Sequence, residues 1–407
     1  MGDKNIKKIL KEKFEKRNKN NFKTIEVLFL IFLTALVGVI IGYLIKSPTK
    51  TKIEDKNIQE IVDNYNYIIN NYYDDVDKDK LLSGAIEGMI NSLDDDYSKL
   101  ISEEGNSTFY ATLEGSYEGI GVQIYNDDNN NIVVLGVLDA SPAKEAGIES
   151  GDIIKKIDDK ILENTDISAL TKYIKDNEKE SYNVVIERNN IEKTLTIKKS
   201  TVTIKSVSSK LIEKENHKIG YIYISIFSNQ TASQFKKILD DLEKQNIDSL
   251  IIDVRENTGG HLTTVTEILS ELLDSNNVIY QIEKNKKVTK YYSTGTVTKK
   301  YPIVILQNKN SASASELLSA ALKESYGATI VGENSYGKGT VQEMISISNG
   351  DNYKFTTKKW LTPDGNWINK KGVEADIKVS LNESYLENPS DENDNQLQEA
   401  INVIVEK

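Results

Sequence analysis

An uncharged apolar segment near the amino terminus limits most strongly how this chain can fold. Residues 27–45 (VLFLIFLTALVGVIIGYLI) form a run of 19 residues without a charged side chain. A helix of about 20 apolar residues spans a bilayer, whereas a helix at the surface of a soluble domain keeps a polar face. We therefore expect residues 25–45 to form a transmembrane anchor that separates a short tail from the rest of the chain.

The charges around this segment predict its orientation. Nine basic residues lie between Lys4 and Lys23, and residues 1–46 carry a net charge of +6, against −17 for the remainder. By the positive-inside rule, the basic tail lies in the cytoplasm and the rest of a single-pass cell-membrane protein lies outside the cell. A cleaved signal peptide is the alternative, but the apolar run is long for one and no A-x-A site follows it.

Composition excludes several classes of function. The chain has no Cys and only two His, His217 and His261. Disulfides and a Cys nucleophile are therefore excluded, and a zinc site, which usually takes three or four N or S ligands, is not expected. The net charge of −11 argues against nucleic-acid binding. We expect neither a metal nor an organic cofactor.

Residues 46–113 are predicted to form a helical arm. Apolar residues recur at helical spacing over residues 58–69 and again over residues 81–90. Such faces pack either within one chain or against a second copy. A homodimer formed through this arm or through the carboxyl-terminal tail is therefore one expected partnership.

Residues 114–200 read as a compact α+β domain with short strands and small helices. The segment YEGIGV at 117–122 and the run SPAKEAGIESGDII at 141–154 together resemble a PDZ domain. This resemblance implies that the terminal carboxylate of a protein or peptide substrate binds backbone N–H groups in the first segment, at Gly119, Ile120, Gly121 and Val122. The alternative is that these glycines only form tight turns.

Residues 201–383 alternate between buried-type strands and helices, which predicts an α/β core with parallel strands and right-handed crossovers. Three loops follow strands, at residues 255–260, 307–313 and 332–340. Because the carboxyl ends of parallel strands meet at one edge of a sheet, these loops should converge there.

The second and third loops carry candidate reactive groups. Ser313 lies at the start of a helix, where free N–H groups and the helix dipole favour developing negative charge. Its alternative role is an ordinary cap, since S-A-S-E is a fair capping box. Lys338 lies in a G-K-G turn, where a solvated lysine is the alternative. In the first loop, Gly259 and Gly260 can direct backbone N–H groups at an anion.

Two other kinds of site fit this sequence less well. Residues 332–338 match most of a phosphate-binding loop, but Gly339 replaces the required Ser or Thr, and a strand-like alternation follows instead of a helix. A Ser-His-Asp triad would need His217, expected in a charged surface turn, or His261, expected at the rim of the site. A lysine base would need burial to lower its pKa from about 10.4.

Several ordered motifs resemble the carboxyl-terminal processing proteases, also called tail-specific proteases. The resemblance extends over residues 60–380 and rests on GAIxGM with LDDxYS (84–98), DVRxNTGG (253–260), SASASE (311–316), VGE with GKGTVQ (331–342) and TPxG (362–365). It departs from the family pattern at Val254, Thr258 and Asn310, none of which removes a catalytic group.

This resemblance implies a serine endopeptidase that cleaves proteins with free apolar carboxyl termini. It makes Ser313 the nucleophile, Lys338 the general base and Gln342 the residue that supports the lysine. It also implies that the backbone N–H groups of Ala314 and of the glycine pair form the oxyanion hole, with Gly259 preferred to Gly260. The alternative is a membrane-anchored peptide-binding scaffold with an inactive core, against which the intact side chains argue.

The complete expectation combines an α/β class with an α+β class: a transmembrane helix, a helical arm, and a PDZ domain that precedes an α/β protease core of parallel strand–helix–strand units. The predicted boundaries are a cytoplasmic tail at 1–24, the anchor at 25–45, the arm at 46–113, the PDZ domain at 114–200, the protease core at 201–383 and a carboxyl-terminal tail or helix at 384–407.

Overall fold

The computed structural model describes residues 3–18, 56–101, 112–162, 167–177, 179–297, 299–346 and 352–406. The chain divides into two compact units, Met1–Leu82 and Ser83–Lys407. The anchor predicted at residues 25–45 lies outside the described residues. Among the residues that are described, no helix is both long enough and apolar enough to cross a membrane.

The first unit is helical where it is described. It contains α1 (Asp3–Asn18) and α3 (Lys56–Asn71), and α4 (Lys78–Asn91) begins at its end. Helices α3 and α4 match the periodicity predicted for the arm, whereas α1 lies in the predicted tail. Helix α3 buries none of its residues, so Ile58 and Ile61 stay about half exposed. Pairing of this apolar stripe with a second copy stays a prediction.

The PDZ region of the second unit is a small α+β fold. Strands β3 (Val122–Asn126), β4 (Ile132–Val137), β5 (Ile153–Ile157), β7 (Ser181–Arg188) and β8 (Ile191–Lys198) form its main sheet, and β2 (Ser116–Gly119) pairs with β9 (Ser200–Thr203). The SPAKEAG sequence explains helix α6 (Pro142–Ala146): the Ser141 side chain caps it by accepting from the Lys144 N–H, and Gly147 ends it in a left-handed conformation.

The α/β core of the second unit is built on a six-stranded sheet in the order β10-β11-β12-β15-β16-β19, whose strands are parallel except for the β10–β11 pair. This confirms the predicted parallel strands. Their bounds are Val207–Lys214, His217–Ile224, Ser249–Asp253, Ile303–Gln307, Thr329–Gly332 and Ile377–Lys378.

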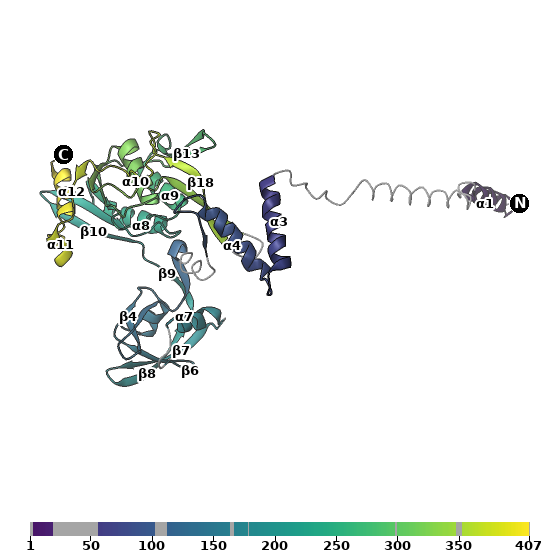
Figure 1. Ribbon diagram of the computed structural model, residues 1–407, viewed down its shortest axis with the longest axis horizontal. Helices are drawn as coiled ribbons and strands as arrows, with labels where there is room; N and C mark the ends of the chain where they lie inside the picture. Colours follow the sequence, from purple (N-terminus) through teal and green to yellow (C-terminus); the bar gives the residue numbers. More distant parts are fainter. Residues whose placement is uncertain are drawn as a thin grey trace. The chain divides into compact units, whose positions relative to one another are not determined.

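Side chains that alternate along these strands explain why both faces of the sheet are covered (Figure 1). Leu250 and Ile252 face α8 (Thr231–Lys244), α9 (Leu262–Leu272) and α10 (Ala314–Ala321), whereas Ile251 between them faces α12 (Asn395–Val405). The apolar face of α12 is therefore buried within the chain. Intramolecular packing, rather than a dimer interface, accounts for the apolar pattern of the carboxyl-terminal segment.

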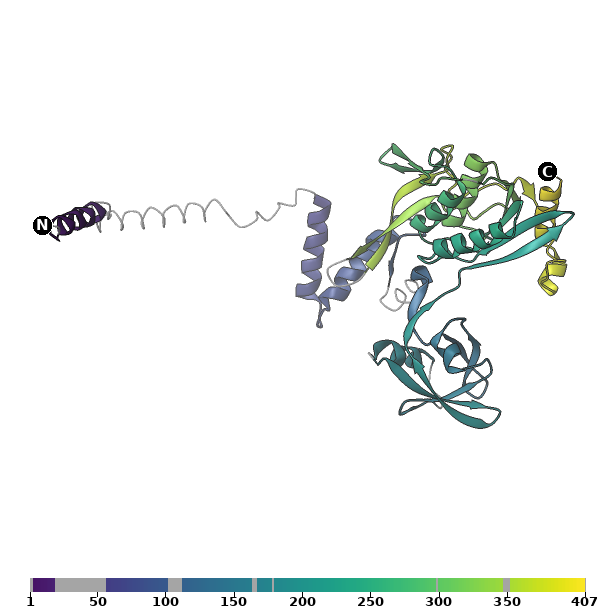
Figure 2. The same ribbon diagram turned by 180° about the vertical axis from the view of Figure 1, so that it is seen from behind.

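A second, antiparallel sheet was not predicted. Strands run in the order β1-β18-β13-β14, and β17 pairs with β18. The yellow-green strands in Figure 2 are part of this sheet. Their bounds are Lys99–Ile101, Asn352–Leu361, Val278–Lys284, Lys287–Tyr292 and Thr340–Ser346. The loop that carries Lys338 runs directly into β17, so this sheet positions the lysine as much as the parallel sheet does.

Candidate active site

Ser313 lies in a sharp turn between β15 and α10. Its φ of 56° and ψ of −112° are unusual for a residue with a side chain and mark local backbone strain. Ala312 and Ala314 on either side are buried, whereas Ser313 is partly exposed. The turn therefore presents the hydroxyl group at the end of the parallel sheet, as the motif predicted.

The glycine pair after β12 lies against this turn. Gly259 has a φ of +110°, and a Cβ placed there would lie 2.9 Å from the Cβ of Ser313 and 3.1 Å from the nitrogen of Ala314. Gly260 has a φ of +145°, and its Cβ would lie 2.2 Å from the carbonyl oxygen of Phe227. Only glycine fits at both positions.

The backbone N–H groups of this region differ from the prediction in one respect. The Gly259 N–H donates to Oδ1 of the buried Asn257 at 2.8 Å, so it is already engaged. Within the described part of the chain, the N–H groups of Gly260 and Ala314 have no hydrogen-bond acceptor. Gly260, rather than Gly259, is therefore the member of the pair that retains an available donor.

Lys338 lies in a loop held by the only two tryptophans of the chain. The indole N–H of Trp360 donates to the Lys338 carbonyl at 2.7 Å, and that of Trp367 donates to the Gly339 carbonyl at 2.8 Å. A Cβ at Gly339 would lie 2.8 Å from the Trp367 indole nitrogen, so this close approach requires glycine. The loop is thus fixed at the position of its lysine.

Glu316 joins the serine turn to the lysine loop. Its carboxylate is fully buried and accepts four hydrogen bonds: from the Ser313 N–H at 2.7 Å, the Ser335 hydroxyl at 2.6 Å, the Gly337 N–H at 2.6 Å and the Lys338 N–H at 2.8 Å. Burial raises the pKa of Glu316, and these hydrogen bonds oppose the rise. The capping-box spacing predicts only the first of the four contacts.

The surroundings of Lys338 favour its neutral form. Burial, followed by the positive charge of Lys354, lowers the pKa of Lys338 to about 8. Its Nζ lies 5.0 Å from the centre of the Tyr97 ring. The segment that carries Tyr97 is attached to β18, because the Ser98 hydroxyl accepts from the Thr356 N–H at 3.0 Å and donates to Asp95.

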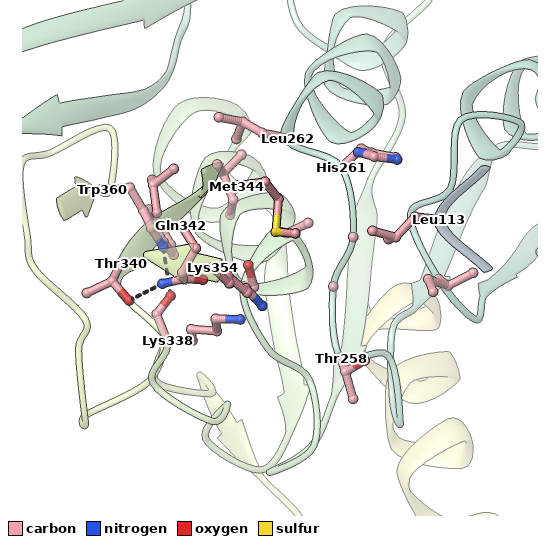
Figure 3. Close-up of a pocket in the computed structure, with 17 residues that line it drawn as sticks. Leu113, Thr258, His261, Leu262, Lys338, Thr340, Gln342, Met344, Lys354 and Trp360 are labelled. Atoms are coloured by element: carbon pink, nitrogen blue, oxygen red, sulfur yellow. Dashed lines mark hydrogen bonds between the residues drawn. The ribbon is translucent and has the colours of Figure 1, made fainter. Parts of the chain in front are cut away.

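Ser313, Lys338 and Gln342 line one cavity of about 470 Å³ (Figure 3). In the described part of the chain no hydrogen bond joins Gln342 to Lys338; the Gln342 amide donates to the hydroxyls of Thr340 at 2.8 Å and Thr356 at 3.2 Å. Nor, among the described residues, does a hydrogen bond join the Ser313 hydroxyl to the Lys338 amine. Such contacts often tighten only when substrate binds.

Neither histidine lies where a Ser-His-Asp triad with Ser313 would need it. His217 begins β11, where its ring lies 3.3 Å from the carboxylate of Asp248 at the surface. His261 lines the cavity beside the glycine pair and precedes α9; its buried Nε2 has no partner among the described residues. Figure 3 shows its ring directed toward Leu113 rather than toward the lysine.

A second cavity, of about 540 Å³, lies in the PDZ domain. All four residues predicted to bind a carboxyl terminus line it, Gly119, Ile120, Gly121 and Val122, and further apolar side chains form its walls: Ile124, Ile154, Ile157, Leu170 and Ile174. Gly121 has a φ of +83°, and a Cβ there would lie 2.3 Å from the Cβ of Ser141, so the loop needs glycine at this point.

Comparisons with known proteins agree with this arrangement. Residues 218–379 match the model of peptidase family S41, residues 119–198 match a PDZ domain, and residues 43–105 match the amino-terminal domain of the activating protease CtpB. Carboxy-terminal processing protease CtpB of Bacillus subtilis (strain 168) is 38% identical over 338 residues, which cover 82% of this chain and 70% of the relative. The chain belongs to the carboxy-terminal processing proteases of peptidase family S41.

A second relative supports the same family. Carboxy-terminal processing protease CtpA of the same organism is 34% identical over 373 residues, covering 88% of this chain and 78% of the relative. A solved structure described as a photosystem II D1 C-terminal processing protease has 23% sequence identity and a TM-score of 0.48, covering 80% of this chain and 94% of the other. Membership of family S41, shown by the relatives CtpB and CtpA, makes the protein a hydrolase, a serine-type carboxy-terminal processing protease with a PDZ domain.

Sequence reasoning about this protease did not identify three residues that complete the site. Glu316 was interpreted as a local cap, and Tyr97 only as part of a family motif. Lys354 carries no local signal, because it is one of three lysines in the same strand. All three approach Lys338 through contacts between distant parts of the chain, as the 258-residue separation of Ser98 and Thr356 illustrates.

Proposed function

We propose that this protease cleaves peptide bonds with Ser313 as nucleophile and Lys338 as general base. The observation that carries the proposal is the buried carboxylate of Glu316, which accepts from the backbone N–H groups of both residues and so holds their loops at one cavity. The low pKa of Lys338, about 8, supports the same assignment because a lysine can accept a proton only when neutral.

The chemistry follows from these positions. Neutral Lys338 takes the proton of the Ser313 hydroxyl as its oxygen attacks the scissile carbonyl carbon. The N–H groups of Ala314 and Gly260 stabilise the oxyanion, a contribution of about 10²–10³ in rate for each donor. The protonated lysine then gives its proton to the leaving amine. Water, activated by the same lysine, hydrolyses the acyl-enzyme. Replacement of either side chain tests this assignment.

We also propose that the PDZ cavity binds the carboxyl-terminal residues of the substrate. Its apolar walls suit an aliphatic or aromatic terminal side chain, and the loop at residues 119–122 suits the terminal carboxylate. Binding there would hold a disordered substrate terminus to the protease and raise its effective concentration at the cleavage site.

Replacing Ile124 by aspartate should weaken binding of a peptide with an apolar, free carboxyl terminus at least about tenfold, because it places a negative charge in the cavity that takes a carboxylate. Gln123, the next residue along β3, is exposed and does not line the cavity, so Gln123→Asp is the matched control. Fluorescence anisotropy with the full chain carrying Ser313→Ala measures affinity without cleavage. Equal affinities in both variants would refute the proposed site.

We propose further that residues 25–45 anchor the protein in the cell membrane, with the tail at 1–24 in the cytoplasm and the protease outside. The 19-residue uncharged run and the basic residues before it support this orientation. An antibody against the PDZ domain should label intact cells, and one against the tail should label them only after permeabilisation. The reverse pattern would contradict the orientation.

A further inference from the structure

A second lysine shares the cavity with Lys338. Lys354 lies in β18, where its backbone pairs with Met344 of β17 on one side and with Lys99 of β1 on the other. Lys354 and Met344 both line the cavity that contains Ser313. Figure 3 shows the side chains of both lysines directed into this space.

Two positive and two negative side chains face Lys338, and of these charges that of Lys354 has the largest effect on its pKa. The carboxylate of Glu316 is occupied by four hydrogen-bond donors, and that of Asp95 accepts from the hydroxyl and backbone of its own turn. Within the described residues, no carboxylate forms an ion pair with Lys338. The charged or titratable groups around it are Lys354 from β18, Lys99 and Tyr97 from the segment before and within β1, Asp95 from the same segment and Glu316 from α10.

Two ammonium groups in one partly buried cavity disfavour each other, since neither is fully hydrated and each raises the cost of protonating the other. One of the two lysines therefore loses its proton at a pH well below that at which an exposed lysine becomes neutral. The pKa values of both residues are lowered: that of Lys338 by burial and then by Lys354, and that of Lys354 by burial and then by Lys99.

We propose that Lys354 is a positioning residue for catalysis, whose positive charge, held beside Lys338 by the β17–β18–β1 strands, keeps Lys338 in the neutral form that can act as a base. Lys99, which pairs with Lys354, also favours the neutral form of Lys338, but by a smaller amount. The inference rests on the proposed function, because it assumes that Lys338 is the general base.

The test is the pH dependence of kcat/KM for a fluorogenic peptide with an apolar carboxyl terminus, measured on the full chain in detergent. For the wild type, kcat/KM should rise with pH and level off above about pH 8. In Lys354→Met the rising limb should move to higher pH, so that kcat/KM falls about tenfold at pH 7 but is unchanged on the alkaline plateau. Lys354→Arg, which keeps the charge, should restore the wild-type profile.

Two further variants separate charge from structure. Lys99→Met should move the rising limb of the kcat/KM profile to higher pH, by a smaller amount than Lys354→Met. If Lys354→Met does not fold, Lys99→Met serves as the test variant. Lys358→Met is the matched control, because Lys358 lies in the same strand and pairs with Glu343 without lining the cavity. Its profile should equal that of the wild type.

The outcomes distinguish this inference from the function on which it rests. Inactive Lys338→Met together with an unshifted profile in Lys354→Met would overturn the inference and leave the proposed function intact. A uniform loss at every pH in Lys354→Met, which Lys354→Arg fails to restore, would also overturn it, because that pattern indicates a structural role. Full cleavage by Lys338→Met would overturn both.

Discussion

Replacing Ser313 by alanine or Lys338 by methionine should each lower kcat/KM for an apolar-tailed peptide by about 10⁴-fold or more. Groups that act as a unit in covalent catalysis lose nearly all of their effect when one is removed, and only transition-state binding by the oxyanion donors remains. Both side chains are partly exposed in the cavity, so neither change should unfold the protein. Peptide cleavage and thermal unfolding, measured on the same preparations, check both expectations.

Ser319 offers a matched control for the serine. It lies in the same helix, α10, and its buried hydroxyl has no hydrogen-bond partner among the described residues. Ser319→Ala should therefore leave both activity and stability close to those of the wild type. Wild-type activity in Ser313→Ala, with Ser319→Ala equally active, would remove Ser313 from the mechanism.

Replacing Glu316 should have the second largest effect, although its carboxylate is buried away from the substrate. Glu316→Ala removes the acceptor of four hydrogen bonds, of which those from Ser335 and Gly337 are fully buried. At about 1–3 kcal/mol for each unsatisfied group, the free energy of unfolding should fall by about 4 kcal/mol or more. Glu316→Gln keeps the shape but places an NH₂ group against two of these donors, so kcat/KM should fall about 100-fold or more even where the fold survives.

The fluorescence of Trp360 and Trp367 gives an independent measurement of the same change, because both indoles donate to the lysine loop that Glu316 holds. Glu316→Gln should alter their emission. Glu333→Gln is the control: Glu333 lies in the lysine loop, and its carboxylate accepts no hydrogen bond among the described residues. If Glu316→Gln has the activity and emission of the wild type, the carboxylate does not hold the two loops together.

The sequence was sufficient to predict the core and the two principal side chains. Buried strands such as Ser249–Asp253 alternate with helices, and this alternation predicts parallel strands whose following loops meet at one edge. Ser313, Lys338 and the glycine pair are predictable at this edge because each lies in a loop that follows a parallel strand. The PDZ domain was predictable for a similar reason, since the cap at Ser141 and the turn at Gly147 are local signals.

The remaining features of the site depend on contacts that no local pattern encodes. The buried position of Glu316 arises because the third loop returns to α10, about 20 residues later in the chain. The engagement of the Gly259 N–H depends on where the Asn257 side chain lies, so sequence alone could not distinguish it from Gly260. The antiparallel sheet brings β1 from the amino-terminal side of the PDZ domain to β18 near the end of the core, a pairing too distant for periodicity to reveal.

Covalent labelling tests the central claim most directly. The full-length protein is treated with a fluorophosphonate, a reagent that reacts with activated serine hydroxyls, and the modified peptide is identified by mass spectrometry. We predict one adduct, on Ser313, whose rate of formation rises with pH toward about 8, and which is absent in Ser313→Ala and at least about 100-fold slower in Lys338→Met. An adduct on a different serine, or equally fast labelling of Ser313 without Lys338, would contradict the assignment of this pair.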